Sequence, residues 1–293
     1  MIKIRLYLLG FKGYATLVEI IKNHGSKIID SVIIGSDNNI RNDYSDEINK
    51  TCNSNSINVI LRKDDISQSD IYSLAIGWRW IIDINRVKNL IILHDSILPK
   101  YRGFNPLVSA VINGETQIGV TALFAGASYD KGDIIYQSIR NIQYPIKINK
   151  AIECITNNYS ELVLKILETL KSGRELPRIK QDTLKVTYSL WRDEEDYQIN
   201  WNWDNSKIKR FIDAVGFPYL GAYSIINGVK IRILEAEEYG EVEIVNRTSG
   251  KVIYFENKCP IVVCGTGLLK IIKMINDTDG SEYVLKNIRV RFK

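Results

Sequence analysis

Short apolar runs alternate with amphipathic stretches over residues 1–172, and the two patterns have different periods. The short runs, bounded by turn residues, predict strands at residues 2–9, 32–35, 58–62, 71–77, 90–93, 118–124 and 134–142. The stretches with helical spacing predict helices at residues 14–22, 45–52, 106–112 and 149–172. Strands that alternate with helices build right-handed βαβ units. We therefore expect an α/β fold with a Rossmann-like, mostly parallel sheet and helices on both of its faces.

The pattern changes after residue 173. Residues 174–184 are polar, contain Pro177 and show no period, so they are predicted to be a linker. From residue 222 onward short apolar runs are separated by turn signals such as Asn227-Gly228. Closely spaced strands of this kind predict a small antiparallel barrel. The expected domains are residues 1–182 and 183–293.

A histidine follows the most apolar of the predicted strands. Residues 90–93 read Leu-Ile-Ile-Leu and are followed by His94, and Asp130 follows the next apolar run at 118–124. Ligands of open α/β sheets bind outside the carboxyl ends of the strands, so His94 and Asp130 are a candidate acid/base pair. The alternatives are a hydrogen-bonded structural histidine and a turn aspartate before Gly132.

The amino-acid composition limits the classes of protein to which this chain can belong. With 45% hydrophobic and 25% charged residues, the sequence predicts a folded globular protein. The net charge of +5 permits an anionic ligand but does not by itself argue for nucleic acid. The N-terminal apolar run is too short for a membrane span and lacks a small-residue cleavage site, so we expect a strand there and no membrane association. Four cysteines without a CxxC pair and only two histidines predict a reduced, cytoplasmic protein without structural zinc.

Several short motifs around His94 agree in order and spacing with one family. The stretch His-Asp-Ser-Ile-Leu-Pro-Lys-Tyr-Arg-Gly from His94, then Gly-Val-Thr, then Tyr-Asp-Lys-Gly-Asp-Ile from Tyr129, resembles the N10-formyltetrahydrofolate-dependent formyltransferases. The resemblance is strongest over residues 90–137, moderate over 190–275 and weakest over the first 70. It implies that His94 and Asp130 carry the chemistry and that the C-terminal domain is an OB-like barrel. One position departs from the pattern, because the family has an Asn two residues before the His and this chain has Ile92.

The resemblance implies folate contacts around the two strand ends, and the residue types found there suggest further roles. Asn105 is the candidate replacement for the missing amide beside His94. Folate binding is expected at Ile76, Trp78, Ser96, Leu98 and Asp133. Arg79, Lys100, Tyr101 and Arg102 are expected to bind a phosphate of the substrate. The alternative is that these four side chains are ordinary solvated surface residues. The alternative to folate binding is that Ser96 tethers its own loop and that Asp133 is a turn residue.

The expected function is transfer of a formyl group from N10-formyltetrahydrofolate, without a metal, to an amine. The sequence of the motif after His94 is more similar to that of the sugar N-formyltransferases than to that of the tRNA enzyme. This similarity implies that the acceptor is a nucleotide-linked amino-deoxysugar destined for a surface polysaccharide such as an O-antigen. Two alternatives remain open: a methionyl-tRNA formyltransferase, and a non-catalytic protein that binds folate or a nucleotide sugar. A homodimer is compatible with the sequence, which does not determine the oligomeric state.

Overall fold

The computed structural model describes residues 2–37, 42–65 and 68–293, and it divides into two compact units. The first unit comprises Met1–Leu107, Thr116–Ile142 and Ala151–Trp191. The second comprises Val108–Glu115, Gln143–Lys150 and Arg192–Lys293. The expected domain boundary after residue 182 stays a prediction about which parts of the chain fold separately.

A seven-stranded sheet forms the centre of the first unit, in the order β3-β2-β1-β4-β5-β7-β8. Its strands are β1 (Ile4–Leu8), β2 (Ile29–Ile34), β3 (Asn58–Leu61), β4 (Tyr72–Ile76), β5 (Leu90–His94), β7 (Gln117–Phe124) and β8 (Ile134–Asn141). The strands from β3 to β5 are mutually parallel, and β7 is antiparallel to both of its neighbours. The predicted mostly parallel sheet is confirmed.

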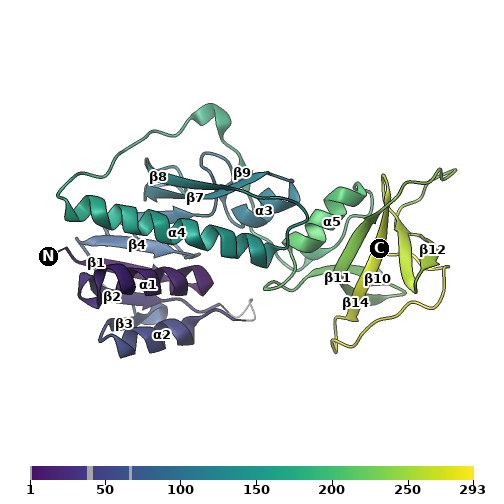
Figure 1. Cartoon of the computed structure of the whole chain (residues 1–293), viewed down its shortest axis with the longest axis horizontal. Helices are drawn as coiled ribbons and strands as arrows, with labels where there is room; N and C mark the ends of the chain where they lie inside the picture. The colour runs from purple at the N-terminus through teal and green to yellow at the C-terminus, as the bar shows by residue number, and fades with distance from the viewer. Residues whose placement is uncertain (1, 38–41, 66–67) are drawn as a thin grey trace. The chain divides into compact units, whose positions relative to one another are not determined.

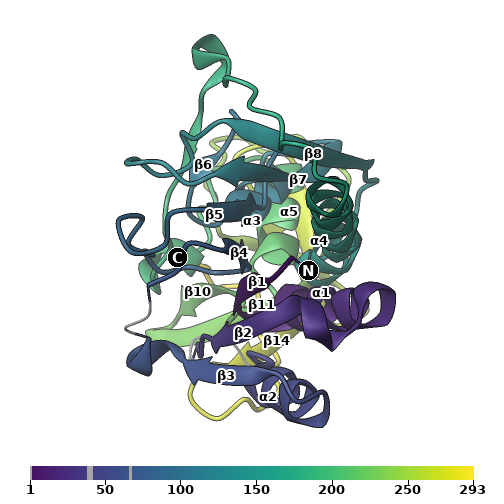
Figure 2. The same cartoon turned by 90° about the vertical axis from the view of Figure 1, so that its left-hand side faces the viewer.

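The two faces of this sheet are covered differently. The helices α1 (Gly10–His24), α2 (Ser45–Ser54) and α4 (Ile148–Lys171) lie on one face, with α4 beside α1 (Figures 1 and 2). On the opposite face, Tyr7 and Ala75 pack with Trp78, Ile82 and other apolar residues. Trp78 and Ile82 belong to the segment between β4 and β5, which forms no helix. Over this part of the sheet, irregular chain therefore buries the face for which we expected helices.

Burial explains why the central strands are continuously apolar. All five residues of β1 are buried, because the strand lies in the interior of the sheet with both faces covered. In α1 the residues Gly13, Leu17 and Ile20 are buried at helical spacing, and the helix ends at Gly25, whose N–H donates to Ile21 O at 2.9 Å.

Three further short elements occur outside the main sheet, and one of them, the helix that begins at Pro106, passes from the first unit into the second at Val108. The pair β6 (Arg102–Gly103) and β9 (Tyr188–Ser189) runs parallel and joins the loop after β5 to the region expected to be a linker. The short helix α3 (Pro106–Ile112) begins at the proline that predicted it. Single 3-10 turns occur at Ser26–Ile28, Arg62–Asp64, Thr183–Lys185 and Glu195–Tyr197.

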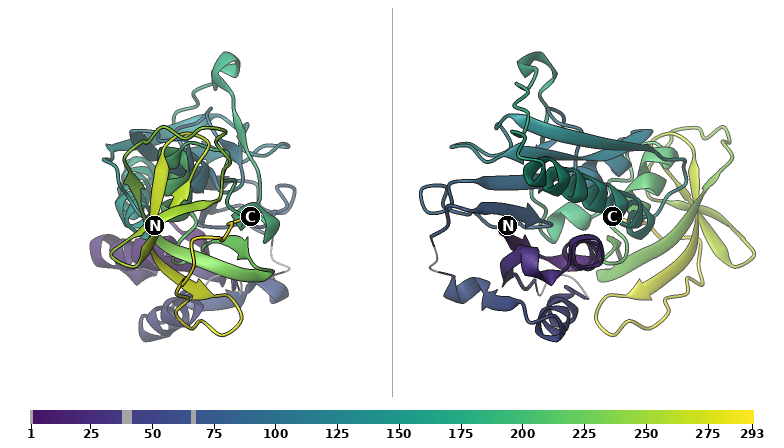
Figure 3. Two further views of the ribbon diagram at one scale, coloured as in Figure 1. Left: turned by 90° about the vertical axis from the view of Figure 1, so that its right-hand side faces the viewer. Right: turned by 60° about the vertical axis from the view of Figure 1, so that its left-hand side comes forward.

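The second unit contains a helix and a closed antiparallel sheet (Figure 3). The helix α5 (Asn205–Ala214), which the sequence did not predict, is capped by Asp204, whose carboxylate accepts from Lys207 N at 2.7 Å. The sheet has the order β10-β11-β14-β13-β12, with strands β10 (Ala222–Ile226), β11 (Val229–Tyr239), β12 (Val252–Glu256), β13 (Cys259–Val263) and β14 (Leu268–Asn276).

The last four residues close this sheet. Lys293 exchanges two backbone hydrogen bonds with Ile225 in β10, and Val290 O accepts from Val252 N in β12. Both edge strands are thus paired with the same segment, as in a barrel. Over the parts of the chain that the structure describes, no helix is both long and apolar enough to cross a bilayer.

Candidate functional site

The end of β5 and the loop between β7 and β8 bring His94 and Asp130 together. Nδ1 of His94 lies 3.5 Å from Oδ1 of Asp130, and the side chains are 8% and 11% exposed. His94 stands at the carboxyl end of β5, where the chain leaves the sheet. The geometry places the two residues as the sequence predicted for an acid/base pair, within reach of each other and largely shielded from water.

Both nitrogens of the His94 ring face hydrogen-bond acceptors. Nε2 lies 2.9 Å from the carbonyl oxygen of Tyr101, while Nδ1 faces the carboxylate of Asp130. A carbonyl and a carboxylate only accept, so a neutral ring satisfies one of these contacts and a protonated ring satisfies both. Exchange of a proton with a substrate at Nε2 therefore requires the ring and the Tyr101 carbonyl to separate.

The backbone is strained where it presents these groups. Tyr101 has φ 59°, Asn105 φ 48° and Asp130 φ 53°, all in the left-handed region that non-glycine residues seldom adopt. Such conformations cost on the order of 1–3 kcal/mol each and persist where surrounding contacts fix them. Their concentration around His94 supports a functional role for this loop cluster.

A glutamine that the sequence analysis did not single out holds the loop of Asp130. Nε2 of Gln181 donates to the carbonyls of Asp130 at 2.7 Å and Gly132 at 2.8 Å, and its Oε1 accepts from Nε and Nη2 of Arg102 at 3.1 and 2.6 Å. The carboxylate of Asp130 also accepts from Gly103 N at 2.8 Å. Gln181 lies in the polar stretch interpreted as a linker, and no local pattern marks it, since its partners are about fifty to eighty positions away.

Gly132 provides a sharp test of this loop. A Cβ at Gly132 would lie 1.7 Å from the carbonyl oxygen of Phe124, whereas a Cβ at Gly126 in the same loop would meet nothing closer than 3.9 Å. We expect Gly132→Ala to displace the loop and lower both stability and turnover, while Gly126→Ala leaves both near the parent values. Denaturant unfolding and steady-state kinetics of the two variants test this. Equal behaviour of the two would contradict the packing described.

The residues expected to bind folate fall into two groups. Ile76 is fully buried at the end of β4, and Trp78 follows it with its ring against Tyr7 and Trp80, at centroid distances of 5.2 and 5.0 Å. The indole nitrogen of Trp78 is buried without a hydrogen-bond partner among the described residues. The Ile76 side chain and the Trp78 nitrogen are both covered by protein, so their predicted contact with folate stays a prediction.

The second group is already engaged with the protein. The Ser96 hydroxyl donates to Lys100 O at 2.7 Å and so tethers its loop, and both backbone groups of Leu98 are bonded, to Thr121 and Gln137. Asp133 forms an ion pair with the exposed Lys180 at 2.9 Å. These contacts give Ser96 and Leu98 a structural role beside the site, and their predicted contact with folate stays a prediction.

The four residues expected at a phosphate differ in burial and in the partners that the structure gives them. Arg102 is 5% exposed and its guanidinium is held by Gln181, so the structure places it as a support of the Asp130 loop. Arg79 is half-exposed after β4 and forms an ion pair with Asp37. Lys100 is exposed and Tyr101 is half-buried in the loop after β5. Asn105 is half-buried just before α3, and its side chain forms no hydrogen bond within the described part of the chain.

A buried charged network fixes the residue that follows His94. The carboxylate of Asp95 accepts from Lys12 in α1 and from the hydroxyl of Tyr159 in α4. Tyr159 is 1% exposed, and this burial, reinforced by the Asp95 charge, raises the pKa of its hydroxyl well above its usual value. The end of β5 is therefore anchored to both helices on one face of the sheet. Among the described residues, no group of three or more His, Cys, Asp or Glu is arranged to hold a metal ion.

Ile92, where the family pattern has Asn, joins two apolar clusters. It packs against the cluster of Tyr7 and Ala75 and against the cluster of Leu98, Leu123 and Ile134. The side chain is therefore part of the packing beneath the site and offers no hydrogen-bond donor.

Comparisons with known proteins show to which family this chain is similar. Residues 72–167 match the model of the formyl transferase family, and residues 192–283 match that of the formyl transferase C-terminal domain. The chain is 30% identical over 182 residues to a methionyl-tRNA formyltransferase from Syntrophomonas wolfei, an alignment that covers 62% of this chain and 57% of the relative.

Two solved structures share the fold over nearly the whole chain. An N-formyltransferase from Helicobacter canadensis, in complex with folinic acid and dTDP-3-aminofucose, has a TM-score of 0.72 at 20% identity and covers 97% of this chain and 100% of its own. WlaRD, a sugar 3N-formyl transferase in the presence of dTDP and 5-N-formyl-THF, has a TM-score of 0.70 at 22% identity. The match covers 92% of this chain and 97% of WlaRD. With the motif around His94 and both domain matches in agreement, the chain belongs to the formyl transferase family.

Proposed function

We propose that this protein transfers a formyl group from N10-formyltetrahydrofolate to the amine of a nucleotide-linked amino-deoxysugar. The observation that carries the proposal is the buried pair of His94 and Asp130 at the carboxyl end of β5, in a family of formyl transferases. Turnover of a formyl-folate tests it, and also separates an enzyme from a non-catalytic protein that only binds folate or a nucleotide sugar.

The chain's own groups meet the proton requirements of such a transfer. The co-substrate supplies the formyl group and an amine leaving group. His94 exchanges a proton with the attacking and leaving nitrogens through Nε2 once Tyr101 O is displaced. Asp130, fixed by Gly103 and Gln181, orients the ring and stabilises it when protonated. The Asn105 amide, without a partner among the described residues, is the candidate donor to the charge that develops on the formyl oxygen.

Two observations favour a sugar nucleotide as the acceptor. The two N-formyltransferases described above match most of the chain with TM-scores of 0.72 and 0.70, and the first binds dTDP-3-aminofucose in its crystal. The sequence match to the tRNA enzyme from Syntrophomonas wolfei spans 57% of that relative, and a methionyl-tRNA formyltransferase from Clostridium thermocellum has the lower TM-score of 0.56 while covering 82% of this chain. A role in making a surface polysaccharide, and a cytoplasmic location where formyl-folate is present, follow as parts of the same proposal.

The methionyl-tRNA enzyme is the second candidate, because it is the class of the sequence relative described above. RNA binding by the second unit would need cations free to contact phosphates. Several of its basic side chains instead pair with acids. Lys147 contacts Glu235 at 2.9 Å, Lys270 contacts Glu256 at 2.6 Å, and Arg247 contacts Glu241. This pairing favours the sugar nucleotide.

Salt dependence distinguishes the two acceptors. A tRNA acceptor releases many counterions on binding, so its affinity should fall by ~10³–10⁵-fold between 50 and 200 mM salt if six to ten phosphates are contacted. A sugar nucleotide has two phosphates, and its affinity should fall only a few-fold over the same range. We expect mild dependence in assays of KM with a panel of amino-sugar nucleotides. Steep dependence with initiator tRNA, and no turnover of any sugar nucleotide, would favour the tRNA enzyme.

A further inference from the structure

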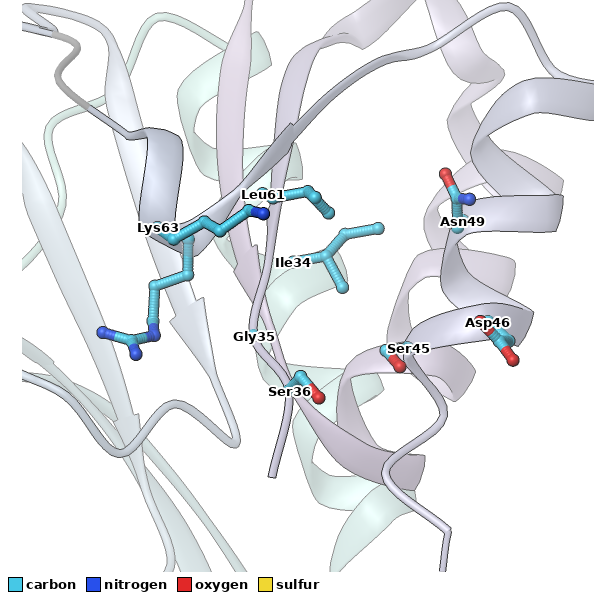
Figure 4. A pocket seen from close by; sticks show the side chains of 9 residues that line it. Ile34, Gly35, Ser36, Ser45, Asp46, Asn49, Leu61 and Lys63 are labelled. Carbon is cyan, nitrogen blue, oxygen red and sulfur yellow. The ribbon is translucent and has the colours of Figure 1, made fainter. Parts of the chain in front are cut away.

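A pocket lies at the same edge of the sheet as His94 but several strands away. It has a volume of about 360 Å³ and lies between the ends of β2 and β3 and the start of α2 (Figure 4). Ile34 and Leu61 provide apolar surface, and Asp46 and Asn49 line it from α2. Its volume is within the range of small-molecule sites, and its position outside the carboxyl ends of parallel strands is where α/β folds bind ligands.

Both walls of the pocket are held in place. Asp43 joins the end of β2 to the start of α2, because its carboxylate accepts from the Ser36 hydroxyl at 2.8 Å and from the Ser45 hydroxyl at 2.7 Å. On the other side, the Arg62 guanidinium lies 4.3 Å from the centroid of the Trp80 ring. Trp80 packs on Gly35, where a Cβ would lie 2.4 Å from the ring. The pocket is therefore a formed site and not a gap between loose segments.

The lining combines groups that suit the base and ribose of a nucleotide. Ile34 and Leu61 offer flat apolar contact for a base, and the carboxylate of Asp46 and amide of Asn49 offer hydrogen bonds to ribose hydroxyls and base edges. Figure 4 shows the Lys63 amine reaching over the pocket beside Leu61. The glutamate tail of a folate is the other anionic candidate, and Asp46 disfavours it by like-charge repulsion.

The distance from His94 also fits a ligand with two separate ends. The strands lie in the order β2-β1-β4-β5, so three strand spacings, about 14 Å, separate the end of β2 from the end of β5. Arg79 follows β4, between these two positions, and is half-exposed. A sugar nucleotide has its amine at one end and its base at the other, with two phosphates between them. These would pass Arg79, whose guanidinium pairs with Asp37 and would share its remaining N–H groups with a phosphate.

We propose that this pocket, lined by α2 and the ends of β2 and β3, binds the base and ribose of the acceptor nucleotide while the amino sugar reaches His94. The inference rests on the proposed function, and it adds the place where the nucleotide is selected. The pocket would then set the preference among nucleoside diphosphates.

Calorimetric titration with UDP, dTDP, CDP and GDP tests the pocket without any formyl transfer. Asn49→Tyr fills it from α2, and Ser54→Tyr, which is exposed at the end of the same helix and outside the lining, is the matched control. We expect the preferred diphosphate to bind the parent protein and Ser54→Tyr alike, and to bind Asn49→Tyr at least ~10-fold more weakly. Lys63→Ala should weaken binding too, whereas Lys27→Ala, at the opposite end of β2, should not.

The outcomes separate the pocket from the function. If amino-sugar nucleotides are formylated and Asn49→Tyr leaves their KM unchanged, the proposed function stands and the pocket proposal is overturned. If diphosphates bind and Asn49→Tyr abolishes binding, but no sugar nucleotide is formylated, the pocket stands and the function is wrong. Loss of affinity for a polyglutamyl tetrahydrofolate instead of a diphosphate, or no diphosphate binding to the parent protein, would also overturn the pocket proposal.

Discussion

Replacing His94 with alanine should lower kcat by ~10²–10⁴-fold, the usual loss when a proton-transfer residue is removed. The side chain is 8% exposed and makes the contacts with Tyr101 O and Asp130 described above, so no neighbouring group can take its place without moving. Steady-state kinetics with formyl-folate and the best amino-sugar nucleotide measure the effect. The KM for the acceptor should change far less than kcat, because the loss lies in the proton transfer.

The matched control is His24→Ala, which removes the chain's other histidine from the end of α1. It should leave kcat unchanged. Circular dichroism and thermal unfolding of both variants check that the sheet remains folded. Near-parent turnover in a folded His94→Ala variant would show that another group moves the proton.

Asp130→Asn should also reduce kcat, for a related reason. The amide keeps the size of the carboxylate but loses its charge, and it can present an N–H towards Nδ1 of His94, which favours the wrong tautomer of the ring. The bond from Gly103 N, 2.8 Å long, can still be accepted by the amide oxygen, so the loop should be retained. Unchanged activity would restrict Asp130 to a structural role.

The sheet was predictable because its signals are local. A strand buried on both faces, such as β1 or β5, is a short apolar run in the sequence, and a parallel sheet follows from its alternation with helices. The position of His94 followed from the same pattern. The proximity of Asp130 required the family resemblance, since the two residues are thirty-six positions apart and spacing alone does not bring them together.

The contacts that fix the site were not predictable, because each depends on the folded path of distant segments. The polar run around Gln181 carries no period, and only the pairing of β6 with β9 and the bonds to Arg102 bring it to Asp130. Arg102 illustrates the same limit. Its position beside a strand end suggested a phosphate ligand, which stays a prediction, whereas its burial and its bond to Gln181 depend on segments far apart in the sequence.

Ile92→Asn restores the amide of the family pattern and should not accelerate this enzyme. The side chain of Ile92 joins two apolar clusters, so Asn there loses that packing and places a partly buried amide among Tyr7, Leu98 and Leu123. An unsatisfied buried polar group costs ~1–3 kcal/mol, and lost packing adds to it. We therefore expect a lower free energy of unfolding by denaturant, while Ile92→Val, which stays apolar, should be affected less.

The reason to expect no gain in turnover is that Asn105 already supplies the missing donor. Loss of one oxyanion donor typically costs ~10²–10³-fold in kcat, so Asn105→Asp, which keeps the shape but removes the N–H groups, should be slow by about that factor. Asp also tolerates the left-handed backbone at φ 48°, which makes it a cleaner test than Asn105→Ala. Folate affinity, measured by titration, should be unchanged in both variants.

An unchanged kcat in Asn105→Asp, or a large gain in kcat from Ile92→Asn, would mean that the site lacks an amide donor and works slowly without one. The double variant Ile92→Asn/Asn105→Asp separates these two explanations. If an Asn at position 92 can donate to the same oxyanion, Ile92→Asn should restore the kcat that Asn105→Asp loses, even though Ile92→Asn has no effect on kcat by itself.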